Sequence, residues 1–359
     1  MSEHDLKTVI ANADLLVTCG PGGVGKTTTA AALGLAAARS GRRVVVVTID
    51  PARRLADALG ISEPTAEPHL VAGAGGNSKG SFSALMLDAE RTFDQLIRDR
   101  AGASADAVLA NPIYRSLAGS LGGAQEYMAI ESLHQLVTSG DYDLVVIDTP
   151  PSRHAMDVLN APDRLVGFLG HPVYRALTIP SRSFAKVTNA ATTAFLWTVK
   201  RLAGPSIVED VVGFFRSIAG MEAGLRERAS EVGAMLRSDR TAFVLVSSPR
   251  SEAVDEATFM ATALHDAGFQ LSAVVVNLVH PLPPELSPAV AQGAADGPLG
   301  EQIAYHHELR TLALAERAEI EGLATATSDD VVLVQVPMLD HDVHDVQALT
   351  EVGNLLGLD

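Results

Sequence analysis

Residues 20–27 constrain this chain more than any other segment, because they fit the pattern G-x-x-x-x-G-K-[ST]. An apolar run, residues 15–19, comes before them, and an alanine-rich stretch of helical period, residues 27–39, comes after them. Glycines at such a strand-to-helix junction let successive backbone N–H groups converge on phosphate oxygens, and the helix N-terminus adds a positive dipole. The segment therefore predicts a phosphate-binding loop.

The side chains of this loop indicate which phosphate ligand it takes. A lysine at position 26 can bridge the terminal phosphates of a nucleotide, and the Thr27 hydroxyl can coordinate Mg²⁺. We therefore expect ATP and Mg²⁺ as the bound groups. The predicted nucleotide contacts in this loop are Gly20, Gly22, Gly23, Val24, Gly25, Lys26, Thr27 and Thr28.

Two further apolar runs end in acidic residues. Asp50 follows residues 43–49, and Asp148 follows residues 144–147. Ligands of open α/β sheets bind at the carboxyl ends of the strands, and a carboxylate placed there is where a metal partner of a phosphate loop sits. Each acid taken alone could instead cap a helix. Two of them beside a phosphate loop favour a metal site made by Thr27, Asp50 and Asp148.

Short β-branched runs alternate with longer segments of helical period, which is typical of a mainly parallel sheet flanked by helices. The sequence thus predicts an α/β P-loop NTPase fold, with an inserted helical subdomain at residues 161–236 between two core segments, residues 1–160 and 237–359. Strands are expected at residues 15–19, 43–49, 84–87, 144–147, 242–246, 273–277 and 331–336. Helices are expected at residues 27–39, 89–100, 126–138, 253–267 and 342–356, and loops at residues 64–81 and 281–300.

Charge and cysteine content narrow the functional classes. The formal net charge of −16 disfavours nucleic-acid binding, because neutralising phosphates requires a basic face. A single cysteine, Cys19, excludes an intrachain disulfide and any all-cysteine metal site made by this chain alone. We expect a cytoplasmic protein, since the first residues lack the positive patch of a signal peptide and no apolar run approaches about 20 residues. Peripheral contact with a membrane surface stays open.

These motifs resemble those of the arsenite-pump and tail-anchored-protein-targeting ATPases, the ArsA-like branch of the deviant-Walker NTPases. Residues 50–57, Asp-Pro-Ala-Arg-Arg-Leu-Ala-Asp, look like the family's switch I, whose final aspartate positions the attacking water, and residues 148–154 look like switch II. The resemblance implies that Asp57 and Lys26 are catalytic. It also implies adenine contacts from Asn277 and from residues 336–339, which contain Pro337 and Leu339. Asn277 could equally be a turn former.

Three departures from the family pattern concern assembly and client binding. Pro21 occupies the position at which relatives carry a lysine that crosses a dimer interface, and Arg153 replaces the usual glycine of switch II. The cysteines that bind zinc or metalloid in relatives are absent. The resemblance therefore implies either a homodimer or a heterodimer with a paralogous ATPase that retains the lysine. A slowly hydrolysing or non-hydrolysing scaffold subunit is the alternative.

Two further readings concern partners. A partition or division-site ATPase would usually carry a basic surface or an amphipathic C-terminal helix, but residues 345–359 contain no Lys or Arg. Residues 165–208 contain five basic residues and no Asp or Glu, interleaved with aromatic side chains. This stretch predicts either a face for a client protein or membrane surface, or an internal cover over the subdomain's own apolar side.

Overall fold

The computed structural model describes residues 5–49, 54–59, 67–74, 79–87, 92, 94, 97–98, 105–110, 124–171, 222–287 and 299–358. The chain divides into two compact units. The first comprises residues 1–86, 141–156 and 239–359, and the second comprises residues 87–140 and 157–238.

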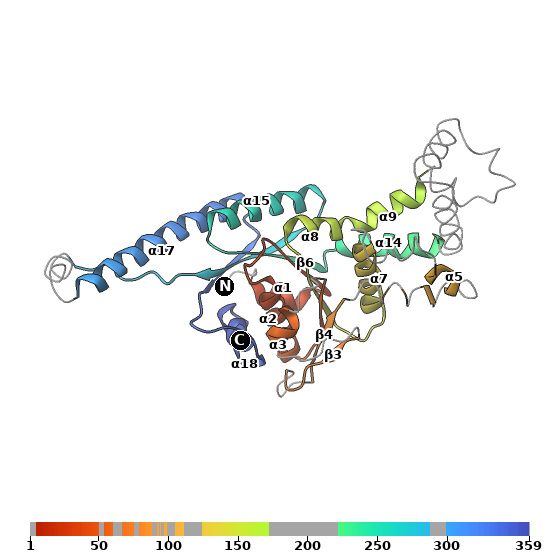
Figure 1. Cartoon of the computed structure of the whole chain (residues 1–359), viewed down its shortest axis with the longest axis horizontal. Helices are drawn as coiled ribbons and strands as arrows, with labels where there is room; N and C mark the ends of the chain where they lie inside the picture. Colours follow the sequence, from red (N-terminus) through yellow and green to blue (C-terminus); the bar gives the residue numbers. More distant parts are fainter. Residues whose placement is uncertain are drawn as a thin grey trace. The chain divides into compact units, whose positions relative to one another are not determined.

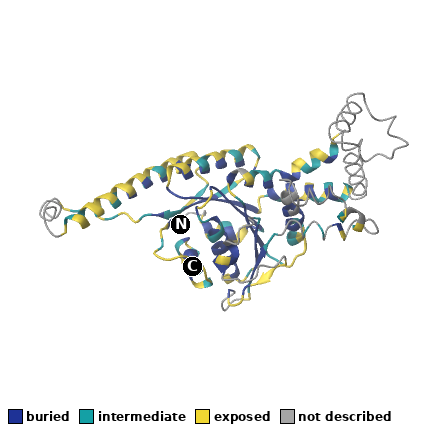
Figure 2. Cartoon of the chain, viewed as in Figure 1, coloured by how far each residue is buried: buried dark blue, intermediate teal, exposed yellow. Residues whose placement is uncertain are grey.

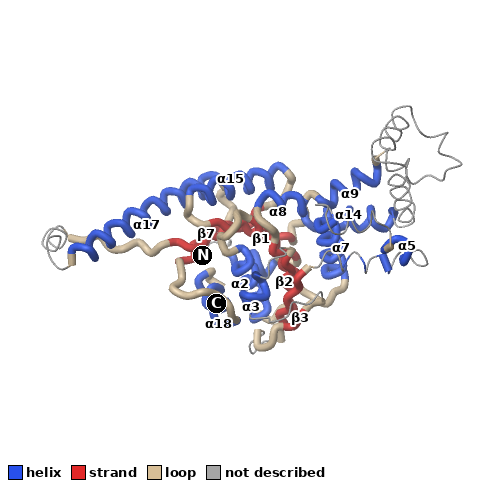
Figure 3. The backbone as a smooth tube through the Cα atoms, viewed as in Figure 1, coloured by secondary structure: helices blue, strands red, loops and turns tan. Residues whose placement is uncertain are grey.

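An eight-stranded sheet forms the centre of the first unit, in the order β3-β4-β2-β5-β1-β6-β7-β8. Only the β3–β4 pair is antiparallel among these neighbours, and every other pair is parallel (Figures 1 and 3). The strands are β1 (Leu15–Cys19), β2 (Arg43–Thr48), β3 (His69–Leu70), β4 (Ser81–Met86), β5 (Leu144–Asp148), β6 (Thr241–Ser247), β7 (Leu271–Val279) and β8 (Val332–Pro337). The predicted α/β P-loop fold is confirmed.

Helices cover both faces of this sheet, which explains why its central strands are apolar on both sides (Figure 2). Alternate residues such as Leu16, Val46 and Val146 form one core with α1 (Leu6–Asn12), α2 (Lys26–Arg39), α3 (Arg54–Leu59) and α18 (Val346–Leu355). On the other face, α15 (Ser251–Asp266) packs on β6 and β7, and α17 (Gly300–Ala326) packs on α15 and β7.

Small residues allow α2 to lie close to the sheet. A Cβ added to Gly34 would lie 2.7 Å from Val46 Cγ2, closer than real Cβ atoms are found, and 3.0 Å from Phe82 Cε2, which is also a tight contact. The alanine-rich composition of this helix therefore serves the packing that places its N-terminus, and the phosphate loop before it, at the carboxyl edge of β1.

Several predicted boundaries are wrong, for identifiable reasons. The helix expected at residues 342–356 begins only at Val346, because the Asp345 carboxylate caps it by accepting a hydrogen bond from the Ala348 N–H at 2.8 Å. The strand expected at residues 84–87 begins at Ser81, within the predicted loop 64–81, which also contains β3. The 27-residue helix α17 was not predicted, and most of the helix expected at residues 89–100 lies outside the described residues.

The second unit is helical in its described part. It contains α5 (Ala105–Leu109), α7 (Ala124–Thr138), α9 (Ala161–Gly170) and α14 (Glu222–Leu236), while α8 (Ser152–Leu159) crosses the boundary between the units. A buried ion pair joins α14 to α7, where Arg228 Nε lies 2.8 Å from Glu131 Oε2. Residues 172–221 lie outside the described residues, so the inserted subdomain at 161–236 and the basic stretch 165–208 stay predictions.

Within the described part of the chain, no helix is long and apolar enough to cross a membrane.

Candidate functional site

The loop between β1 and α2 adopts a backbone that favours glycine. Gly20, Gly23 and Gly25 have φ angles of 139°, 77° and 91°, in the left-handed region that side chains disfavour. Two of these glycines also have no room for a Cβ. At Gly20 it would lie 2.0 Å from the Val246 carbonyl oxygen, and at Gly25 it would lie 2.3 Å from Asn277 Nδ2. Residues of the neighbouring strands β6 and β7 therefore pack directly against the backbone of this loop.

Helix α2 begins directly after this loop, at Lys26. Its N-cap is Gly25, and no side chain caps the first turn. The first N–H groups of an α-helix have no partner within the helix, so they are available to bind an anion there. The backbone thus supports the predicted phosphate-binding role.

The predicted lysine and threonine of the loop both lie against other polar groups. Lys26 is only 7% exposed, and its Nζ donates a hydrogen bond to the Pro21 carbonyl oxygen at 2.6 Å. Thr27 Oγ1 donates a hydrogen bond to Asp148 Oδ2 at 2.7 Å. The structure therefore brings Thr27 and Asp148 together from positions 121 residues apart.

Asp148 is held at this edge by a second threonine that the sequence reading did not single out. Thr48, at the end of β2, donates through Oγ1 to the same Asp148 Oδ2 at 2.9 Å, and both residues are 1% exposed. The two strands are neighbours, with Thr48 and Asp148 in register. A buried carboxylate and an adjoining hydroxyl are hard oxygen donors of the kind that Mg²⁺ selects. The residues present therefore fit a Mg²⁺ ion.

A cavity of about 350 Å³ opens beside these groups. It is lined by Gly23, Gly25, Lys26, Thr27, Thr28, Asp57, Ala58, Thr149 and Val343. Asp57 reaches it from α3 and is exposed. The cavity thus brings the predicted catalytic residues, Lys26 and Asp57, into one space. Ala58, Thr149 and Val343 were not predicted as contacts, although Thr149 lies within the predicted switch II segment, residues 148–154.

The remaining predicted residues either do not line this cavity or lie outside the described residues. Val24 is buried, and its carbonyl oxygen accepts a hydrogen bond from Asn277 Nδ2 at 3.0 Å. Pro337 is exposed at the end of β8, and Leu339 packs partly against the core. Gly20 and Gly22 belong to the loop but do not line the cavity. Asp50 and the side chain of Arg153 lie outside the described part.

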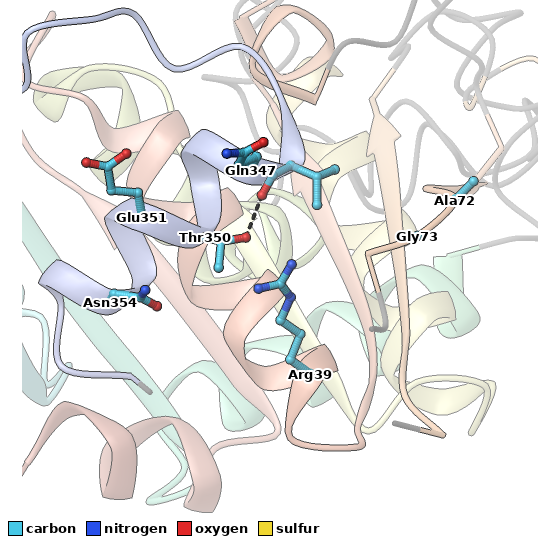
Figure 4. A pocket seen from close by; sticks show the side chains of 8 residues that line it. Arg39, Ala72, Gly73, Gln347, Thr350, Glu351 and Asn354 are labelled. Carbon is cyan, nitrogen blue, oxygen red and sulfur yellow. Dashed lines mark hydrogen bonds between the residues drawn. The ribbon is translucent and has the colours of Figure 1, made fainter. Parts of the chain in front are cut away.

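A larger cavity of about 540 Å³ lies at the other end of α2, near α18 (Figure 4). Among its lining side chains, Arg39 is the one cation and Glu351 the one carboxylate, and the Thr350 hydroxyl already donates to the Val346 carbonyl oxygen at 2.6 Å. Because α2 is about 21 Å long, this cavity is remote from the phosphate loop. The smaller cavity, which holds the reactive groups, is therefore the candidate site.

A phosphate loop at the carboxyl edge of a parallel sheet, with a strand-end aspartate bonded to its threonine, defines the class of P-loop nucleoside triphosphatases. The sequence profile of the anion-transporting ATPases (ArsA_ATPase) matches residues 13–289, and the chain belongs to this family.

Individual relatives are distant. An uncharacterized protein of Streptomyces coelicolor is 28% identical over 337 residues, which cover 93% of this chain and 78% of that protein. ATPase GET3 of Malassezia globosa is 26% identical over 342 residues, covering 94% and 88%. ATPase ARSA2 of Chlamydomonas reinhardtii is 32% identical over 166 residues, covering 45% and 42%. The latter two carry the name ATPase, and the family to which this chain belongs is one of ATPases.

Proposed function

We propose that this chain binds Mg-ATP at the loop of residues 20–27 and hydrolyses it, using the energy to change conformation. The observation that carries the proposal is the bond from Thr27 to Asp148, made at the rim of a cavity that Lys26 and Asp57 also line. Phosphoryl transfer needs positioning and charge stabilisation more than covalent chemistry from the protein. The groups gathered here supply both.

Each residue has a separate task in this proposal. Thr27 and Asp148 would hold Mg²⁺, with Asp50 as the third predicted partner, and the bound ion would supply positive charge opposite the terminal phosphates. Lys26 leaves the Pro21 carbonyl oxygen and binds those phosphates together with the amides that open α2. Asp57 orients the attacking water. Asn277, Pro337 and Leu339 contact the adenine.

Two substitutions separate binding from hydrolysis. Lys26→Ala should abolish nucleotide binding, because the buried ammonium is the loop's own cation. Asp57→Asn should leave binding largely intact and remove hydrolysis, because the amide keeps the shape but loses the charge that orients water. Nucleotide affinity and steady-state phosphate release are measured for both. Asp266→Asn, an exposed acid at the end of α15, is the matched control. Near-normal turnover by Asp57→Asn would remove the water-positioning role.

The assembly follows from position 21. Proline has neither a side-chain charge nor a backbone N–H, so Pro21 cannot provide a cation to a partner's phosphates. A cation supplied across an interface can be worth roughly 10³-fold in rate. We therefore propose that the chain acts as a dimer. A homodimer should hydrolyse ATP slowly, whereas a heterodimer with a paralogous ATPase that retains the lysine should have one complete site.

The steady-state rate of ATP hydrolysis tests this pairing. It is measured for the purified chain alone, for the Pro21→Lys variant, and for the chain with candidate paralogues added. Faster turnover with a paralogue supports the heterodimer. Equal turnover in all three samples means that another cation, such as Arg53, Arg54 or Arg153, has taken the role. If no sample turns over but all bind ATP, the chain is the nucleotide-gated scaffold subunit instead.

The output of the cycle is proposed to be binding and release of a client protein or membrane partner in the cytoplasm. Losing the γ-phosphate removes the contacts that order the two switch segments, residues 50–57 and 148–154, and so changes the surface offered to the partner. The resemblance of residues 50–57 and 148–154 to the switch segments of the tail-anchored-protein-targeting ATPases favours a protein client. Affinity purification of the ATP-trapped Asp57→Asn chain identifies the client.

A further inference from the structure

The regular pairing of strand β7 is interrupted next to Asn277, whose side chain contacts the phosphate loop. Leu278 has a φ of 62° and is the one non-glycine residue with a positive φ in the described part of the chain. The pairing of β7 with β8 shifts register between Val276 and Val279 at the same place. A leucine disfavours this conformation, so its surroundings must impose it.

The residue before this kink contacts the nucleotide-binding loop. Asn277 Nδ2 donates to the Val24 carbonyl oxygen at 3.0 Å and lies where a side chain at Gly25 would otherwise be. A carbonyl can only accept, so the NH₂ end of the carboxamide must face Val24. The other end, Oδ1, is then an acceptor with a fixed orientation.

The residues after the kink are fixed from two directions. The Met338 N–H donates to the Val279 carbonyl oxygen at 3.0 Å. From α17, Glu316 accepts two hydrogen bonds from His280, one from its backbone N–H at 2.9 Å and one from ring Nδ1 at 2.7 Å. The Glu316 side chain is 7% exposed, which makes this pair of hydrogen bonds a buried clasp on the main chain three residues beyond Asn277.

We propose that Glu316, acting through His280, is a positioning residue that aims the Asn277 carboxamide at the nucleotide base. This inference deepens the proposed function and rests on it. Adenine carries an amino donor at the position where guanine carries a carbonyl acceptor. An oriented Oδ1 accepts from the first and repels the second. The clasp therefore determines the preference for adenine over guanine nucleotides and makes it depend on the position of α17.

A thermodynamic cycle on the full-length chain tests this positioning role. The dissociation constants of ATP and GTP are measured by competition with a fluorescent nucleotide for wild type, Glu316→Leu, Asn277→Ala and the double variant. Each single variant should lower the ATP-over-GTP preference by about tenfold, equivalent to one lost hydrogen bond of about 1.4 kcal/mol. The double variant should lose no more than either single variant, because both changes remove the same contact.

Two further variants distinguish a positioning role of Glu316 from a general loss of structure. Glu316→Gln keeps the side-chain volume and one acceptor, so it should fold and show an intermediate preference. Glu321→Leu places the same substitution at an exposed position of α17 and should leave the preference unchanged.

Three results would overturn the inference: an unchanged base preference in Glu316→Leu and Glu316→Gln, additive effects in the double variant, or an equal effect of Glu321→Leu. Wild type that binds ATP and GTP equally would remove the role of Asn277 in base selection while leaving the phosphate site intact. Wild type that binds neither nucleotide would remove the proposed function itself.

Discussion

Replacing Thr48 by valine removes one of the two hydroxyl groups that donate to the buried carboxylate of Asp148. The substitution keeps the β-branched shape that suits a strand, so the main loss is the 2.9 Å hydrogen bond. A hydrogen bond to a charged group contributes roughly 1.5–3 kcal/mol to stability, against roughly 0.5–1.5 kcal/mol for a neutral pair.

A matched control is available on β1, which pairs with β5 on the side opposite to β2. Thr18 is also buried, also lies near the end of its strand, and donates through Oγ1 to a neutral acceptor, the Ile147 carbonyl oxygen, at 3.2 Å. We therefore expect Thr48→Val to lower the free energy of unfolding by about 1–2 kcal/mol more than Thr18→Val. Urea unfolding followed by circular dichroism, without nucleotide, measures both, provided that the slopes agree. An equal or larger loss in Thr18→Val would refute the charge-assisted role of Thr48.

Two other predictions follow from the same unit. Gly25→Ala should weaken nucleotide binding at least tenfold, because its Cβ would lie 2.3 Å from Asn277 Nδ2, whereas Gly41→Ala, at a φ of 105° with nothing within 4 Å, should cost stability but leave binding unchanged. Asp143→Asn should lower stability at pH 7 but not near pH 2. Hydrogen bonds from Arg43 lower the pKa of Asp143 from 3.8 to about 2, so its contribution is present above pH 3.8 and lost as the pH falls through 2. Urea midpoints across this pH range check it, and loss of the difference already at pH 5 would contradict it.

The phosphate loop could be predicted because its constraints are local. Gly20, Gly25, Lys26 and Thr27 lie within eight consecutive residues, and the apolar run before them has the same limits as β1. The aspartate that the sequence indicated, Asp148, ends the strand beside β1, since the predicted parallel sheet brings strand ends together. Periodicity and strand-end chemistry were sufficient for these features.

Contacts made between distant segments could not be predicted in this way. Thr48 and Asp148 are 100 residues apart, and a threonine at the end of a β-branched run has an adequate explanation in strand propensity alone. His280 and Glu316 are 36 residues apart, with a proline-rich segment between them. The start of α18 was misplaced for a related reason: Asp340, Asp342 and Asp345 are all acceptable caps, and only the fold selects the last.

The strand order explains why the loop is sensitive to both sides of the sheet. β1 lies between β5 and β6, and β7 follows β6. On one side, Asp148 at the end of β5 bonds to Thr27. On the other, β6 abuts Gly20 and β7 presents Asn277 to Val24. A displacement of β5 would move Asp148, which is proposed to hold the metal with Thr27. A displacement of α17 would instead act on the loop through His280, the kink at Leu278 and Asn277. The two sides should therefore affect different steps, hydrolysis for the first and base recognition for the second.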